Sequence, residues 1–71
     1  MSHRRTPHLL EIDKQILNSL KRRSVKSPAL IGVEIGRDRR YVANRLRYLT
    51  DIGFVEKVIR GLYRLRIAGD K

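Results

Sequence analysis

The sequence predicts one small, mostly helical α+β domain in which three helices precede a C-terminal β-hairpin. Apolar residues recur three or four positions apart in the first 51 residues, which is the helical period. Two strand-like runs, "FVEKVI" and "LYRLRI", then follow, separated by Arg60-Gly61, a pair that suits a tight hairpin turn. A chain of 71 residues has room for one core, so we expect a basic N-terminal arm at residues 1–8, a folded domain at 9–68 and a tail at 69–71.

The first helix is expected to end near the basic "KRR" at 21–23, because positive charge suits a helix C-terminus. Two starts are open: Thr6-Pro7 at the N-cap and first helical position, or Asp13 for a shorter helix. The "SVK" that follows is a candidate short strand. The core face of this helix consists of apolar residues at helical spacing: Leu9, Ile12, Ile16 and Leu20.

The second and third helices have clear boundary signals. Ser27-Pro28 starts the second helix and Gly36 stops it. Asp38 is placed to cap the third helix, which is expected to run to about Asp51 and to end at Gly53. These two helices are therefore separated by a very short turn.

Two glycines indicate how the second and third helices pack. Gly32 has no side chain and lets the helices cross closely, and Gly36 lets the chain reverse between them. The angle between the helices would be filled by three branched residues: Ile31, Ile35 and Val42. Residue types at these intervals predict a helix-turn-helix. The hairpin directly after the third helix makes the predicted fold a winged helix-turn-helix, three helices plus a C-terminal β-hairpin wing.

The charge of the chain indicates its class of partner. Seventeen Lys and Arg against seven Asp and Glu give a net charge of +10, and twelve of the seventeen are arginine, the residue that binds phosphate and guanine in a bidentate way. A nucleic acid is the leading partner. The apolar stripes are sized for a core and no run is long enough to span a bilayer, so a membrane is disfavoured. We expect no enzyme, because no catalytic or metal-ligand constellation and no phosphate loop is present; we also expect no cofactor and no metal.

The third helix holds the strongest candidate contacts. With Val42, Leu46 and Leu49 on its buried face, the helical period places Arg40 and Asn44 on the opposite, outward face. Arginine pairs with guanine and asparagine with adenine, so these two are our candidates for reading base edges in a major groove. The competing reading is ordinary solvated surface, which is about even for Asn44.

Further candidates surround this pair. Arg37 and Arg39 could contact base or phosphate, Arg47 suits phosphate, and Ser27 stands at the start of the second helix. Tyr41 could stack on a sugar or bond a phosphate, although partial packing competes with that role.

Arg45 and Tyr48 are read as structural residues of the same helix. Arg45 flanks the buried row and could pair with an acid such as Asp38 or Glu11. Tyr48 is expected to pack against the first helix or the hairpin.

The hairpin supplies the candidate wing contacts. Tyr63, Leu65 and Ile67 should face the core and alternate with outward residues. A two-residue turn would set Lys57 opposite Arg64 with Arg60 at the tip, and facing like charges favour a negative partner between them. The competing reading is that these charges keep an edge strand from pairing with another chain.

Three stretches of the sequence resemble a known group. "DKQILNSL", "SPALIGVEIG" and "RRYVANRLRYLTDIGFVEKVIRGLYRL" are similar to small archaeal winged-helix proteins, including the haloarchaeal phage repressor family, over residues 11–67. The ending "RGLYRL" after "GFVEKV" is the most specific part. The strong basicity departs from the acidic composition of haloarchaeal proteins and favours another archaeon, or a virus of one, as the source.

The resemblance implies a repressor-like transcription regulator that reads double-stranded DNA in the cytoplasm, associated with the nucleoid. The alternative is an RNA-binding or ribosome-associated winged helix, against which the shortage of exposed aromatic residues argues. The sequence leaves open a homodimer formed through the first helix and the N-terminal segment.

Overall fold

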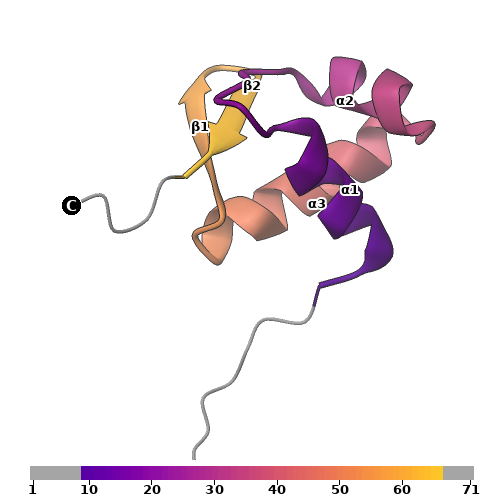
Figure 1. Ribbon diagram of the computed structural model, residues 1–71, viewed down its shortest axis with the longest axis horizontal. Coiled ribbons are helices and arrows are strands. Elements are labelled where there is room, and N and C mark those ends of the chain that lie inside the picture. The colour runs from indigo at the N-terminus through magenta and orange to yellow at the C-terminus, as the bar shows by residue number, and fades with distance from the viewer. Residues whose placement is uncertain (1–8, 67–71) are drawn as a thin grey trace, which may run out of the picture.

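The computed structural model describes residues 9–66, which form three helices and one two-stranded antiparallel sheet (Figure 1). The elements are α1 (Glu11–Ser19), α2 (Pro28–Ile35), α3 (Arg39–Asp51), β1 (Val55–Ile59) and β2 (Leu62–Leu65). The predicted α+β, mostly helical class is confirmed. The basic arm, the Thr6-Pro7 start, Ile67 and the tail lie outside the described residues.

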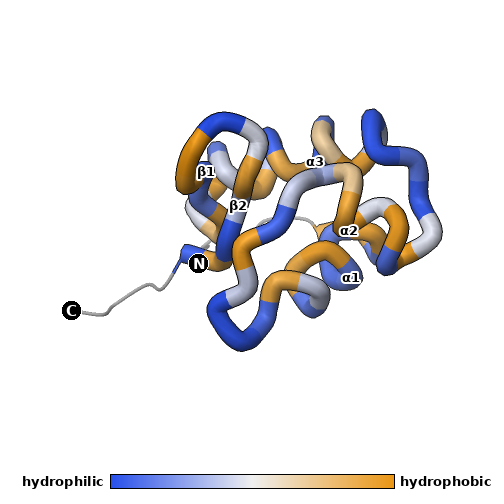
Figure 2. The backbone as a smooth tube through the Cα atoms, turned by 90° about the horizontal axis from the view of Figure 1, so that it is seen from above, coloured by the Kyte–Doolittle hydropathy of each residue, from blue (hydrophilic) through white to orange (hydrophobic). Residues whose placement is uncertain are grey.

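Every element contributes to one core. The buried side chains come from α1 and its C-cap, from α2, from α3 and from both strands: Ile12, Ile16, Leu20, Ile31, Val42, Leu46, Leu49, Val55 and Tyr63. The helical spacing seen in the sequence therefore marks the inward face of each helix correctly. In Figure 2 the turn between β1 and β2 is hydrophilic at its tip, with hydrophobic segments on both sides.

The first helix begins at Glu11, with Leu10 as its N-cap, and ends at Ser19. Asp13, one of the two predicted starts, lies inside the helix, and the residues of the other start, Thr6-Pro7, are not described. Its C-cap is Leu20, and Arg22 and Arg23 have left-handed backbone torsions (φ 65° and 60°) that no α-helix can contain. The "KRR" segment is thus a turn that directly follows the C-cap, so the helix ends near this segment, as predicted.

The boundaries of α2 and α3 follow the predicted signals. The Ser27 hydroxyl accepts a hydrogen bond from the Leu30 N–H, and the Asp38 carboxylate accepts one from the Arg40 N–H at 3.1 Å. Gly36 ends α2 with φ 72°, a conformation that favours glycine.

Gly32 marks a close approach of α2 to the following turn. A Cβ atom on Gly32 would lie 2.6 Å from the Arg37 carbonyl oxygen, which is too short for any real contact. The predicted role of Gly32 is therefore confirmed, since the backbone of the turn occupies the space that a side chain would need. This contact fixes where α3 starts relative to α2.

The hairpin register differs from the prediction by one residue. The two-residue turn is as expected, because Ile59 pairs with Leu62, but a bulge at Val58 then sets Lys57 opposite Tyr63. Arg64 consequently faces Glu56 and not Lys57. The predicted pair of facing like charges is wrong, so these two residues no longer indicate a negative partner between them.

The "SVK" segment joins the hairpin through a single bridge and is not a strand. Lys26 exchanges two backbone hydrogen bonds with Tyr63, at 3.0 and 2.9 Å. This bridge connects the start of α2 to β2, so the hairpin and α2 are held in one body.

Candidate nucleic-acid interface

One row of polar side chains runs along the outward face of α3. Arg40, Asn44 and Arg47 are all exposed, and they lie opposite the buried residues of the same helix. Within residues 9–66 the structure gives these three side chains no ion pair or hydrogen bond. The row therefore presents two unneutralised positive charges and one amide to solvent, at spacings of four and three residues along one helix face.

The opposite flank of α3 is tied to α1 by a buried acid. Arg45 donates to Asp13 through Nε at 2.7 Å and Nη2 at 2.6 Å, and Asp13 is fully buried. Asp13 also accepts a hydrogen bond from the Leu10 N–H at 2.8 Å. Such a bidentate pair adds geometric specificity to the contact between the two helices. The predicted pairing of Arg45 with an acid is confirmed, but the partner is Asp13 and neither of the suggested acids, Asp38 or Glu11.

The electrostatics of this pair follow from its contacts. Burial by itself raises the pKa of Asp13, but the hydrogen bonds from Arg45 and from the Leu10 N–H outweigh it and hold that pKa below its ordinary value. The same carboxylate raises the pKa of Arg45. Arg45 also lies over the ring of Tyr48, 4.5 Å from its centroid. Arg45 and Tyr48 are therefore structural groups, as the sequence indicated for their general role.

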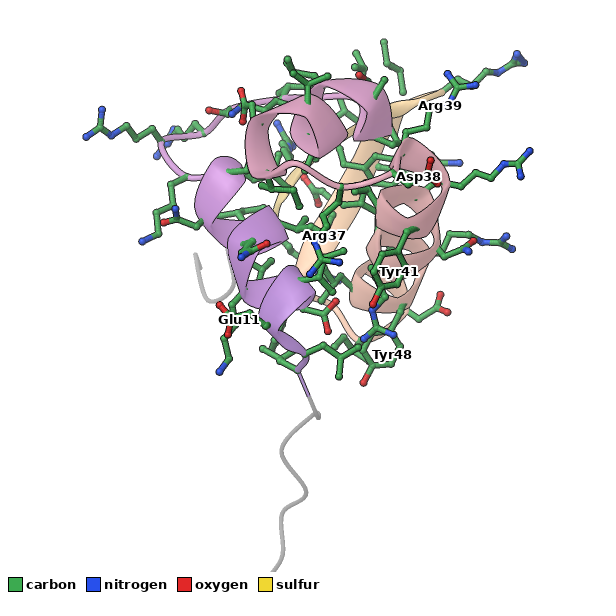
Figure 3. The ribbon with its side chains drawn as sticks, turned by 90° about the vertical axis from the view of Figure 1, so that its right-hand side faces the viewer. Glu11, Arg37, Asp38, Arg39, Tyr41 and Tyr48 are labelled. Carbon is green, nitrogen blue, oxygen red and sulfur yellow. The ribbon has the colours of Figure 1, made fainter. Side chains whose placement is uncertain are left out.

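Arg37 and Tyr41 are set apart from the outward row. The Arg37 guanidinium lies 5.8 Å from the centroid of the Tyr41 ring, and Figure 3 shows both residues on the same flank of α3 as Tyr48. Arg39 extends away from the helices in the same view. Arg39 is exposed at the first position of α3. The structure thus divides the predicted recognition residues into an outward row and a separate Arg37–Tyr41 contact.

The end of the outward row adjoins the hairpin. A shallow groove between α3 and the strands is lined by Arg47, Thr50, Asp51, Lys57 and Tyr63. The bulge at Val58 puts Lys57 beside Tyr63, on the side of the hairpin that faces α3. Arg47 and Lys57 therefore line one groove although ten residues separate them, and two cations at such a groove suit a phosphate group.

The remaining predicted wing residues differ in how their charge is balanced. Arg64 is paired with Glu56 through its Nε. Arg60 is exposed at the hairpin turn and makes no ion pair within the described residues. Arg60 and Lys57 are therefore the stronger candidates of the hairpin, and Arg64 the weaker one.

A second polar cluster, formed by Ser19, Lys26 and Glu34, holds the start of α2 in place. The sequence did not predict it. The Lys26 ammonium donates to the Ser19 carbonyl at 2.6 Å and to the Glu34 carboxylate at 2.7 Å, and the Ser19 hydroxyl donates to the same carboxylate. The hydrogen bonds from Lys26 and Ser19 lower the pKa of Glu34. Ser27, the predicted contact at the start of α2, directly follows Lys26 and uses its hydroxyl as the N-cap. This cluster positions α2 against α1.

The structural roles of three residues, Asp13, Lys26 and Glu34, were not predicted from the sequence. Asp13 follows the buried Ile12 in the first turn of α1, so an acid next to a core position was the available signal. Lys26 precedes α2 and Glu34 lies near its end, eight residues later, and no spacing rule connects them. Long-range pairs of this kind depend on how the helices dock.

Comparison of the chain with protein-family models, curated proteins and solved structures found no match. In residues 9–66, no three His, Cys, Asp or Glu side chains gather closely enough to hold a metal ion. None of the helices in that part of the chain has the length and apolar character needed to cross a membrane.

Proposed function

We propose that residues 9–66 form a winged helix-turn-helix domain that binds double-stranded DNA. In this proposal α2, the turn at residues 36–38 and α3 are the helix-turn-helix, and the β1–β2 hairpin is the wing. The α3 helix enters the major groove and the hairpin contacts the neighbouring backbone or minor groove. The protein would act at the nucleoid as a repressor-like transcription regulator, in keeping with the resemblance noted in its sequence.

The outward row of α3 is the observation that carries the proposal. A major groove admits one α-helix, and the groove edge of each base pair offers hydrogen-bond groups to that helix. Arg40 and Asn44 lie in the first half of α3, exposed and without an internal partner among residues 9–66. Arg40 fits a guanine edge and Asn44 an adenine edge, each with about 1–3 kcal/mol of discrimination when the contact is bidentate.

The groove between α3 and the hairpin supports a backbone contact beside the base contacts. Arg47 and Lys57 line it, and Arg60 stands further out on the hairpin turn. A DNA backbone that follows α3 would reach these cations in succession. Arg39 is placed for a phosphate at the other end of the helix, and Ser27 for one at the start of α2.

A net charge of +10 supports a nucleic-acid partner but does not distinguish DNA from RNA, because both are polyanions. The shape of the site favours DNA. The deep major groove of A-form RNA is too narrow to admit a helix, whereas that of B-form DNA fits one. Tyr41 and Tyr48 already lie beside Arg37 and Arg45, so they offer no open platform for stacking single-stranded bases.

The proposal is tested by titrating labelled random-sequence duplex DNA, single-stranded DNA and duplex RNA with the protein over a range of salt. Arg40→Ala and Arg60→Ala are the test variants. Lys14→Ala is the matched control, since it removes one exposed positive charge from α1, away from the proposed interface. We expect duplex DNA to bind best with a steep salt dependence, and both test variants to bind more weakly than the control.

Equal or tighter binding to RNA would overturn the proposal and favour the RNA-binding alternative. Test variants that bind DNA like Lys14→Ala would show that the charge of the chain, and not the α3 face, provides the binding. If duplex DNA binds most tightly, a selection of sequences from a random pool then identifies the operator.

A further inference from the structure

The turn between α1 and α2 carries three cations in succession: Lys21, Arg22 and Arg23. All three residues are exposed. Within residues 9–66 the structure gives their side chains no ion pair and no hydrogen bond. We call these three residues the basic turn. It is a surface of unneutralised positive charge that the proposed helix-turn-helix and wing do not use.

The backbone of the basic turn has an uncommon conformation. Arg22 has φ 65° and Arg23 has φ 60°, and no other non-glycine residue of the described chain has a positive φ. Ser24 closes the turn, because its N–H and its hydroxyl both donate to the Lys21 carbonyl oxygen, at 3.4 and 2.8 Å. A turn whose two central residues both have positive φ is normally formed by glycine, asparagine or aspartate. Two arginines occupy those positions here.

This conformation is strained for arginine. With a left-handed backbone, the Cβ atom of an L-residue lies too close to the following carbonyl oxygen, and glycine avoids that cost. Strained residues of this kind are concentrated at binding and functional sites. Glycine at either position would serve folding better, so the two arginines indicate a contact that uses their charge.

The dipole of α1 gives a competing explanation for the cations. Positive charge is stabilising at a helix C-terminus, and Lys21 directly follows the C-cap Leu20. The effect is confined to the last turn of a helix. It therefore accounts for Lys21 and not for an arginine at each of the two strained positions.

The basic turn lies away from both the hairpin tip and the outward row of α3. Lys26 pairs antiparallel with Tyr63, so the chain before Lys26 runs back from the hairpin tip toward the end of β2. Figures 2 and 3 both show α1 on one side of the fold and α3 on the other, with the segment that follows α1 on the α1 side. The basic turn and the α3 row can therefore contact separate partners at the same time.

We propose that the basic turn is a second nucleic-acid-binding surface, which contacts the phosphate backbone of one duplex while α3 occupies another. Lysine and arginine neutralise phosphates whatever the base sequence, so this contact does not depend on the operator. The turn has no apolar side chain to enter a lipid layer, so a membrane gains less from it. The choice of a nucleic acid rests on the proposed function, because a chain bound through α3 is surrounded by further duplex.

Two-dimensional heteronuclear NMR of the whole chain, titrated with a short random-sequence duplex beyond the equimolar ratio, tests the proposal. We expect the amide signals of α3 to shift first and those of residues 21–24 to shift in a second, weaker event. The second event should weaken steeply with salt, because its cations replace counterions of the DNA backbone. Phosphatidylglycerol vesicles provide the comparison with a membrane surface.

The outcomes of the titration separate the two proposals. Shifts confined to α3 and the hairpin at every duplex concentration would overturn the second surface and leave the proposed function standing. Shifts at residues 21–24 without shifts in α3 would support the second surface and overturn the proposed function, and no shifts at all would overturn both. If the vesicles shift residues 21–24 and the duplex does not, the turn binds membranes and the second surface is overturned.

Arg22→Gly and Arg23→Gly test the two side chains themselves. Each variant removes one charge and supplies a residue that adopts positive φ without strain, so it should unfold at the same or a higher urea concentration than wild type. Each should weaken the second binding event at least about threefold and lower its salt slope by about 0.9. Arg23→Lys keeps the charge and should keep the second event.

Lys14→Ala is the matched control, since it removes one exposed cation from the first half of α1. The first binding event should change no more in the glycine variants than in this control. A second event as strong in the glycine variants as in Lys14→Ala would overturn the proposal whatever their stability.

A capture experiment tests the simultaneous contact with two duplexes. Wild type bound to an immobilised duplex should retain a labelled duplex from solution. Arg22→Gly and Arg23→Gly should retain less of it, although they bind the immobilised duplex as Lys14→Ala does. Equal retention by the glycine variants and Lys14→Ala would show that another surface joins the duplexes, and the proposal would fail.

Discussion

Arg45 on α3 donates two hydrogen bonds to the fully buried Asp13 carboxylate on α1, although 32 residues separate them. The pair links α3 to α1 beside the buried row of Val42, Leu46 and Leu49. With that row facing the core and Arg45 bound to α1, the row of Arg40, Asn44 and Arg47 points to solvent. The ion pair thus adds to the apolar packing that holds α3 in this orientation.

Asp13→Asn should lower the free energy of unfolding by about 2–3 kcal/mol at neutral pH, because Arg45 loses its charged partner in a buried position. Urea unfolding followed by circular dichroism measures the change. Glu11→Gln is the control, since Glu11 is an exposed acid in the same turn of α1 and should change stability little. A loss as small as that of Glu11→Gln would mean that the Asp13–Arg45 pair adds no net stability.

The same pair predicts a dependence on pH. The pKa of Asp13 is lowered in the folded state, so its contribution is complete above the unfolded value near 3.8 and is lost as the pH falls through the lower folded value. The difference in unfolding free energy between wild type and Asp13→Asn should therefore be constant from about pH 7 to about pH 5 and shrink below about pH 4. A difference that stays constant into acid would contradict the lowered pKa.

Gly32→Ala should destabilise the protein by about 1–3 kcal/mol, although alanine is the better helix former by about 1 kcal/mol. The reason is the 2.6 Å approach of the added Cβ to the Arg37 carbonyl, a backbone atom that cannot swing away. Gly36→Ala provides the comparison, because a Cβ there meets nothing within 4 Å and only its φ of +72° opposes the change. Unfolding in urea measures both, and a Gly32→Ala variant at least as stable as wild type would show that the turn relaxes freely.

The elements that could be predicted from sequence are those specified by local rules. The caps at Ser27 and Asp38 and the stop at Gly36 depend on neighbours within four residues, and the structure has each of them as expected. The inward and outward faces of α3 followed from the helical period alone. The first helix likewise ends close to the basic segment that was expected to end it, although its sequence gave no sign of the left-handed torsions at Arg22 and Arg23.

The parts that could not be predicted depend on contacts between distant segments. A bulge at Val58 has no marker in "VEKVI", yet it moves Lys57 opposite Tyr63 and leaves Arg64 to Glu56. The choice of Asp13 as the partner of Arg45 depends on how α1 docks on α3. The predicted hairpin therefore forms with a different register, and among the proposed wing contacts the correction favours Lys57 over Arg64.

If the protein binds DNA as proposed, we expect the hairpin cations to contribute unequally, because Glu56 pairs with Arg64 alone. Removing one cation that neutralises a phosphate lowers the slope of log affinity against log salt by about 0.9. Lys57→Ala and Arg60→Ala should each show a loss of this size, and Arg64→Ala a smaller one, because Glu56 already balances its charge. Binding isotherms on a random duplex at several salt concentrations measure the slopes. A loss for Arg64→Ala equal to that for Lys57→Ala would mean that DNA breaks the Glu56 pair and recruits Arg64.

The outward row of α3 should divide into residues that read bases and a residue that holds the backbone. On the best duplex from a sequence selection, Arg40→Ala and Asn44→Ala should each weaken binding by about 1–3 kcal/mol. On random duplex, Asn44→Ala should bind with nearly the affinity of wild type, because asparagine carries no charge. Arg47→Ala should weaken binding to both duplexes alike and lower the salt slope, because it lines the groove shared with Lys57. Competition binding with the selected and random duplexes separates the two effects. If Asn44→Ala selects the same sequence with the same preference as wild type, then Asn44 is solvated surface and the base reading must come from other residues of α3.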